Sequence, residues 1–114
     1  MEQVYLGKIS SVKFGIGGYR DCMIGLELGF KFDGSSWISD TRHMEWDANL
    51  IECSKNCKWT ESDRDRKYAE IMRFLSDLLN QCGVKTVEKL KGMPVEIKIE
   101  NGGLKEWRIL TEVI

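Results

Sequence analysis

The four cysteines and the single histidine are the residues of this chain whose chemistry best suits a metal ion. Cys53 and Cys57 are separated by three residues, His43 lies ten residues before Cys53, and Cys82 follows further along. Structural zinc requires four such ligands that converge, and its usual sequence signature contains two closely spaced pairs. Here there is one pair, and Cys82 falls on the apolar side of a predicted helix, where a thiol packs without a metal. We therefore expect no bound metal and no cofactor.

The sequence contains no recognisable set of catalytic residues. A nucleophilic cysteine needs a neighbouring base, and every scheme of that kind would depend on His43 alone. Asp40, Glu45 and Asp47 lie close to His43 in sequence, but no spacing rule selects them from the eighteen acidic residues. We expect a protein that is not an enzyme.

Residues 15–18 (GIGG) have the glycine content of a phosphate-binding loop. In such a loop the glycines lead from a strand into the N-terminus of a helix, whose amides then face the phosphate. Here a strand is predicted to follow, and the lysine and hydroxyl residue of a Walker loop are missing. We expect a tight turn instead, which would display Tyr19, Arg20 and Asp21 for contact with a partner.

The aromatic and basic residues do not combine into an evident nucleic-acid surface. Seventeen basic and eighteen acidic residues give a formal net charge of -1, so the chain as a whole has no field that attracts nucleic acid or an anionic membrane. The charged run at residues 64–67 (RDRK) has mixed sign and is expected to face solvent. Tryptophans can stack on bases, but we expect most of them in or beside the core. They are Trp37, Trp46, Trp59 and Trp107.

These residues need a scaffold, and its clearest part is a helix predicted over residues 60–82. Thr60 can cap it, because its hydroxyl can accept the free backbone N–H of Asp63, and Gly83 can end it. Charged residues, Arg64 among them, occupy the face expected to lie in water. At ~1.5 Å per residue the helix would be roughly 34 Å long. Its apolar residues recur at steps of three and four and comprise Tyr68, Ile71, Met72, Leu75, Leu78, Leu79 and Cys82.

The remaining segments predict strands on both sides of that helix. The first strand loses its alternation near Ser10, where a bulge would restore the inward face. The order is strand-strand-strand-helix-strand-strand, which favours an α+β fold in which an antiparallel sheet of about five strands packs on one long helix. We expect a single domain over residues 1–114. The strands comprise residues 4–14, 22–32, 35–46, 95–99 and 104–113.

The chain carries no segment that would direct it out of the cytoplasm or into a membrane. No apolar signal segment follows Met1, and no apolar run approaches the ~18 residues of a membrane span. We therefore expect a protein of the host-cell cytoplasm with no membrane partner. Its four thiols should be reduced, as is usual in that compartment. Unpaired sheet edges leave self-association into a homo-oligomer open.

Three segments carry a resemblance to known proteins. They are residues 17–25 (GGYRDCMIG), 58–64 (KWTESDR) and 107–113 (WRILTEV). In these segments, which occur in the same order and span most of the chain, the sequence resembles a family of small proteins encoded by tailed phages and prophages. The family brings no catalytic or binding residues that could be transferred to this chain. The resemblance implies a phage genome, which encodes many small accessory proteins, among them inhibitors of bacterial defences such as CRISPR–Cas systems.

Three functions remain open at this point. The first, which we favour, is a non-enzymatic phage accessory protein that binds a host protein complex and sterically inhibits a bacterial defence system, as anti-CRISPR proteins do. The second is a protein that sequesters a nucleotide or another signal molecule in a pocket of aromatic residues beside Arg20. The third is a nucleic-acid-binding module, which the balanced charge makes the least favoured.

Overall fold

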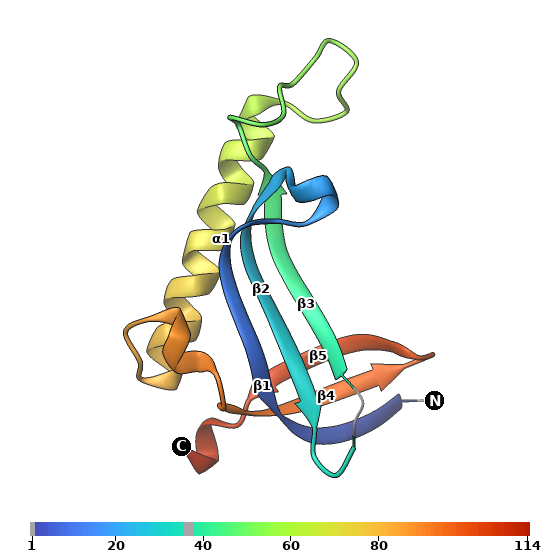
Figure 1. Cartoon of the computed structure of the whole chain (residues 1–114), viewed down its shortest axis with the longest axis vertical. Helices are drawn as coiled ribbons and strands as arrows, with labels where there is room; N and C mark the ends of the chain where they lie inside the picture. Colours follow the sequence, from blue (N-terminus) through green and yellow to red (C-terminus); the bar gives the residue numbers. More distant parts are fainter. Residues whose placement is uncertain (1, 36–37) are drawn as a thin grey trace.

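One antiparallel sheet and one long helix make up the computed structural model, which describes residues 2–35 and 38–114 (Figure 1). The α+β prediction with five strands is therefore confirmed. Trp37 lies outside the described residues, so its place beside the core stays a prediction. The elements are β1 (Glu2–Gly17), η1 (Tyr19–Asp21), β2 (Met23–Phe32), β3 (Ile38–Trp46), α1 (Glu61–Cys82), η2 (Val87–Leu90), β4 (Pro94–Glu100), β5 (Gly103–Ile109) and η3 (Thr111–Val113), where η marks a short 3-10 turn.

β1 is the longest strand and joins the two parts of the sheet. The strand order is β3-β2-β1-β4-β5. Residues 2–8 of β1 pair with β4, whereas residues 7–17 pair with β2. The register shifts between Ile9 and Ser11, which confirms the predicted bulge. Because a bulge bends and twists its strand, the sheet changes direction here, and β4 and β5 run steeply across β2 and β3 (Figure 1).

The hydrophobic core lies where the sheet, α1 and β5 meet. Alternate residues of β2, namely Leu26, Leu28 and Phe30, are completely buried on one face, since alternate side chains of a strand share a face. β5 contributes Trp107, whose ring centroid lies 4.9 Å from that of Phe30. The buried cluster comprises Ile9, Leu26, Leu28, Phe30, Phe32, Leu75, Leu78, Cys82, Leu90, Val95, Ile97, Ile99 and Ile109.

Both ends of α1 follow the local sequence signals. The hydroxyl of Thr60 accepts the backbone N–H of Asp63 at 3.1 Å, and the Asp63 carboxylate accepts the N–H of Thr60 at 2.9 Å. Gly83 ends the helix with a φ of 69°, which glycine adopts without a steric penalty. The predicted cap is therefore confirmed. Within the described part of the chain, no helix combines the length and the apolar character that crossing a bilayer requires.

For two residues of α1 the predicted exposure to solvent was wrong. Arg64, predicted to face water, is only 2 % exposed, whereas Met72, predicted to face the core, is 56 % exposed. Arg64 lies four residues before Tyr68 and seven before Ile71, so it falls on the same helix face as both. Its burial follows from that periodicity together with hydrogen-bond partners that only the folded chain provides.

Candidate functional site

The connection between β1 and β2 holds the residues that the sequence predicted for partner contact. β1 continues through Gly17, so the predicted turn at residues 15–18 is displaced towards residues 18–22. The displacement occurs because pairing with β2 continues as far as Gly17 opposite Met23. Gly18 then adopts a φ of 69°, and a Cβ there would lie 2.8 Å from Met23 Sδ. Gly18 is therefore the residue that allows this reversal.

Arg20 and Asp21 adopt left-handed backbone conformations, with φ values of 51° and 54°. Both residues are exposed, and the turn is closed by N–H groups of Asp21 and Cys22 that donate to the carbonyls of Gly18 and Tyr19, at 3.3 Å and 3.0 Å. Left-handed conformations of residues other than glycine cost energy and persist where the surrounding structure imposes them. Two in succession on an exposed turn make η1 a preformed rather than a flexible segment.

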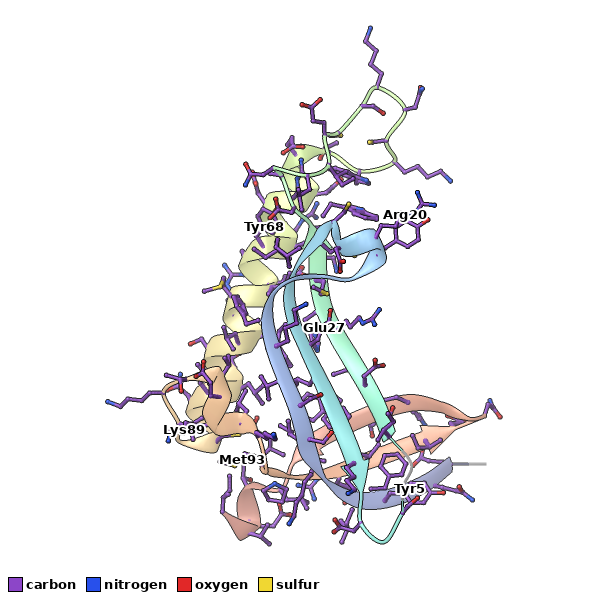
Figure 2. The ribbon with its side chains drawn as sticks, viewed as in Figure 1. Tyr5, Arg20, Glu27, Tyr68, Lys89 and Met93 are labelled. Atoms are coloured by element: carbon purple, nitrogen blue, oxygen red, sulfur yellow. The ribbon has the colours of Figure 1, made fainter. Side chains whose placement is uncertain are left out.

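The side chain of Tyr19 is braced from two sides although it is 61 % exposed. Its ring meets Trp46 edge to face with 6.2 Å between centroids, and the Arg20 guanidinium lies 5.4 Å from the Tyr19 centroid. Trp46 ends β3, so the sheet itself supports the turn. Figure 2 shows Arg20 at the end of the molecule opposite Tyr5, directed away from the sheet. Tyr19, Arg20 and Asp21 thus form one exposed unit, and their role in partner contact stays a prediction.

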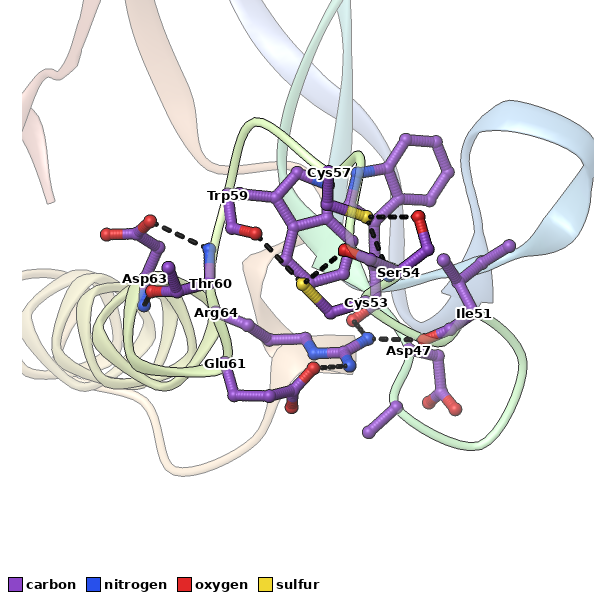
Figure 3. A network of polar contacts seen from close by, with 12 residues as sticks. Asp47, Ile51, Cys53, Ser54, Cys57, Trp59, Thr60, Glu61, Asp63 and Arg64 are labelled. Carbon is purple, nitrogen blue, oxygen red and sulfur yellow. Dashed lines mark hydrogen bonds and ion pairs between the residues drawn. The ribbon is translucent and has the colours of Figure 1, made fainter.

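Arg64 organises the loop at residues 47–60 beside this turn (Figure 3). Its Nη1 donates to the carbonyl oxygens of Ile51 at 2.7 Å and Trp46 at 3.3 Å, and its Nη2 pairs with Glu61. The guanidinium also lies 4.7 Å from the ring centroid of Trp59. One buried cation therefore fastens the start of α1 to the loop and to the end of β3. This role of Arg64 was not predicted from the sequence, although its helical spacing from Tyr68 indicates that both side chains share one helix face.

Tyr68 and Asp47 complete the attachment of the loop. The Tyr68 hydroxyl donates to the carbonyl of Trp46 at 2.6 Å and accepts the N–H of Ala48 at 3.1 Å. Asp47 is 7 % exposed, and its carboxylate accepts the N–H of Asn49 at 2.8 Å. Asp47 therefore shapes the loop and has a structural partner for its charge.

The other acidic residues near His43 in sequence do not join Asp47. Glu45 accepts the backbone N–H of its neighbour Trp46 at 2.7 Å, and Asp40 lies on the exposed surface, 4.0 Å from Arg42. Each of these carboxylates thus has its own local partner. The acid–base site considered from the sequence is not formed by them.

Cys53 and Cys57 lie together in the loop at residues 47–60 (Figure 3). The Cys53 thiol donates to the carbonyl of Trp59 at 2.9 Å, and Cys57 Sγ accepts the N–H of Ser54 at 3.0 Å. The hydrogen bonds from Ser54 lower the pKa of Cys57, whereas burial raises the pKa of Cys53. The two thiols therefore have different acidities and are each engaged in local hydrogen bonds.

The remaining candidate zinc ligands lie elsewhere. Cys82 ends α1 and is buried in the core, about 33 Å of helix away from the start of α1. His43 stacks on Phe74 with 3.8 Å between ring centroids. Burial and the nearby charge of Lys67 lower the pKa of His43, so its ring is neutral at pH 7. Among residues 2–35 and 38–114, no group of three or more histidine, cysteine or acidic side chains is placed to hold a metal ion.

An apolar cavity of about 360 Å³ opens between the sheet and the first half of α1. Phe14 and Ile24 line it from the strands, and Met72 lines it from the helix. The nucleotide pocket considered from sequence was placed beside Arg20, but this cavity lies apart from η1. Its lining residues are Phe14, Ile24, Gly25, Asp47, Ala48, Asn49, Tyr68, Ile71 and Met72, without a basic side chain.

Comparisons with known proteins add no information on these residues. No protein-family model, no curated protein and no solved structure matches this chain.

Proposed function

We propose that this protein acts by binding another protein and that η1 is the contact. The observation that carries the proposal is the pair of exposed left-handed residues, Arg20 and Asp21, on a turn that Trp46 braces through Tyr19. A preformed turn loses little conformational entropy on binding, and aromatic and arginine side chains are the residues that contribute most at protein interfaces. The protein would act sterically and without catalysis.

The partner we propose is a component of a bacterial defence complex. This step depends on the resemblance of three segments to small phage proteins, one of which, residues 17–25, includes η1. A rigid body of this size, 13.2 kDa, is large enough to cover a substrate or subunit site on a larger complex. The function would then be that of an anti-CRISPR-like inhibitor in the cytoplasm of the host cell.

The experiment is affinity purification from bacteria that carry a defence system, followed by a phage-restriction assay. We expect the tagged protein to co-purify with a defence component and to relieve restriction. Arg20→Glu should abolish both effects, because it reverses the charge of an exposed side chain of the turn that supports no core contact. Arg42→Glu is the matched control, since Arg42 is also an exposed arginine but lies on β3.

Two results would contradict the proposal. Wild-type protein that retains no host protein would remove the binding function itself. Retention that is equal for Arg20→Glu and Arg42→Glu would remove η1 as the contact, whatever the partner.

The apolar cavity supports a second candidate function, the sequestering of a small molecule. Phe14 and Tyr68 offer aromatic surface to a ring, and Asp47 and Asn49 offer polar groups at its edge. The absence of a basic residue from the lining favours an uncharged apolar ligand over a nucleotide phosphate. Thermal-shift measurements with nucleosides, nucleotides and apolar rings would test it, and Ile71→Trp, which fills the cavity, should remove any shift.

Nucleic-acid binding remains the least supported function. Of the basic run at residues 64–67, Arg64 is buried, Arg66 pairs with Asp63, and Lys67 lies 3.5 Å from Glu70. Paired basic residues release few counterions from a phosphate backbone and so gain little affinity. Binding of DNA or RNA that weakens steeply with salt would overturn this view.

A further inference from the structure

Half of β1 has a strand neighbour on one side only. Residues 7 and 8 pair with both β4 and β2, whereas residues 2–6 pair with β4 alone. At Ile9 the outer edge is still closed, since its N–H donates to Met93 at 3.0 Å and its carbonyl accepts from Gly92 at 2.7 Å. From residue 11 to 17 the ladder partners within the described chain all belong to β2. This segment, which we call the free edge, is the upper half of β1 in Figure 1.

The free edge differs from the two outer strands of the sheet. An exposed edge presents backbone N–H and C=O groups that can pair with another strand, and charged side chains normally oppose such pairing. β3 carries Asp40, Arg42 and Glu45 along its nine residues, and β5 carries Lys105, Glu106 and Arg108 along its seven. The free edge has the sequence SVKFGIG, with a single charge at Lys13. It therefore carries fewer charges against unwanted pairing than either outer strand.

Apolar side chains accompany the free edge on the face that α1 covers. Phe14 and Ile16 are 39 % and 40 % exposed, and Met72 projects beside them from α1 with 56 % exposure. Phe14 and Met72 also line the cavity between sheet and helix. An occupant that suits this surface is an extended strand whose alternate residues are apolar, because those residues would lie on the cavity side.

We propose that the occupant is the free edge of a second copy of this chain, paired antiparallel about a two-fold axis at Phe14. In that register Phe14 faces Phe14, Val12 faces Ile16, and Ser11 faces Gly17. All seven residues then pair, and the apolar side chains of both copies lie on the same face of a continuous ten-stranded sheet.

Charge and space both favour this register over one with its axis at Lys13. With the axis at Phe14, Lys13 faces Gly15, where a Cβ would meet no atom within 4 Å, so the lysine side chain has room. With the axis at Lys13, the two lysines would face each other, and like charges directly opposite destabilise a strand pair. With the axis at Phe14 the segment is thus complementary to itself over all seven residues, without opposing charges.

The test changes the charge at residue 15 and measures mass by sedimentation equilibrium over a range of concentrations. Wild-type protein should pass from 13.2 kDa to 26.4 kDa, twice that mass, as its concentration rises. Gly15→Lys should weaken the dimer by roughly tenfold, because the two-fold axis repeats the unfavourable pair with Lys13. Gly15→Glu should strengthen it, and the double variant Lys13→Glu/Gly15→Lys should also dimerise more tightly than the wild type, because each places two opposite-charge pairs across the axis.

The controls separate edge pairing from folding. Thr41→Lys places the same charge on the β3 edge and should leave the dimer unchanged. Unfolding temperatures of the residue 15 variants should be no lower than that of the wild type at concentrations where all are monomers, because a side chain fits at this position and glycine weakens a strand. A wild-type mass of 13.2 kDa up to millimolar concentration, or a dimer indifferent to the charge at residue 15, would overturn the proposal. The proposal does not rest on partner binding through η1, so either can fail alone.

Discussion

The two ends of this molecule share β1 but differ in how they are held together. At the closed end, residues 2–9 of β1 meet β4, β5 and η2, and buried apolar residues such as Leu90, Val95 and Ile97 are completely covered. At the open end, residues 11–17 of β1 meet η1, the loop at residues 47–60 and the start of α1. There Phe14, Tyr19 and Met72 are exposed, and the polar Arg64 and Asp47 are buried alongside the apolar Leu26 and Ile71.

The contrast indicates that the two ends are stabilised by different interactions. Burial of apolar surface stabilises the closed end, since each fully buried large side chain contributes about 1.5–3 kcal/mol. The open end is held by hydrogen bonds to backbone carbonyls, which fix a shape while leaving apolar and aromatic groups at the surface. Both proposed interaction surfaces, η1 and the free edge, belong to the open end.

The largest expected effect is the loss of a core ring. Phe30→Ala should lower the free energy of unfolding by about 3–5 kcal/mol, because Phe30 is completely buried against Trp107 and leaves a cavity. Phe14→Ala, a matched change at the open end, should cost only ~1 kcal/mol. Urea denaturation of both variants measures the difference, and equal losses would remove the distinction between the ends.

Arg64→Met should be the most damaging change at the open end. It removes the donor that serves Ile51 and Trp46 and should lower Tm by about 5–10 °C, as measured by thermal unfolding. Arg66→Met is the control, because Arg66 forms an exposed pair with Asp63 and such pairs contribute little. If Arg64→Met and Arg66→Met had the same Tm, the hydrogen bonds of Arg64 would not be what stabilises the loop.

The helix cap should contribute an intermediate amount. Thr60→Ala removes the acceptor for the Asp63 N–H and should cost about 1 kcal/mol in chemical denaturation. Thr60→Ser keeps a hydroxyl at the same position and should retain most of that stability. A serine variant as unstable as the alanine variant would indicate that the methyl group, not the cap, matters.

A smaller effect should depend on pH. Burial holds the pKa of His43 below its usual value of about 6.5, so the folded protein binds fewer protons than the unfolded chain. The stability it contributes is present above that value and is lost as the pH falls through the lowered pKa. Urea denaturation at several pH values should show this decline in the wild type and not in His43→Phe. Hydrogen bonds also lower the pKa of Asp63, but that group acts at more acidic pH.

The smallest change is expected at Met72. Because its side chain is 56 % exposed, Met72→Gln should alter the free energy of unfolding by no more than ~0.5 kcal/mol. Leu75→Gln, three residues further along the same helix at a buried position, should be far more destabilising. A large loss for Met72→Gln would mean that the open end depends on apolar burial after all.

Features that the sequence predicted correctly depend on residues close together in the chain. The cap at Thr60, the end of α1 at Gly83 and the bulge near Ser10 each follow from local hydrogen bonding or from the alternation of a few side chains. The number of strands and their grouping around one helix follow from the same local patterns. The extent of β1 was predicted too short because pairing with β2 holds Gly15 and Gly17 in an extended conformation. The last strand was predicted too long: it ends at Ile109, where its pairing with β4 ends opposite Val95, and residues 111–113 form η3.

Long-range pairing decided the rest. The sequence determined by itself which segments form helix and strands, because capping and periodicity act over a few residues. Only the tertiary structure decided that Arg64 is buried, that Cys82 lies far from Cys53, and that β4 covers one half of β1 and leaves the other half free. Those outcomes depend on contacts between residues as far apart in sequence as Glu2 and Glu100, which no local pattern encodes.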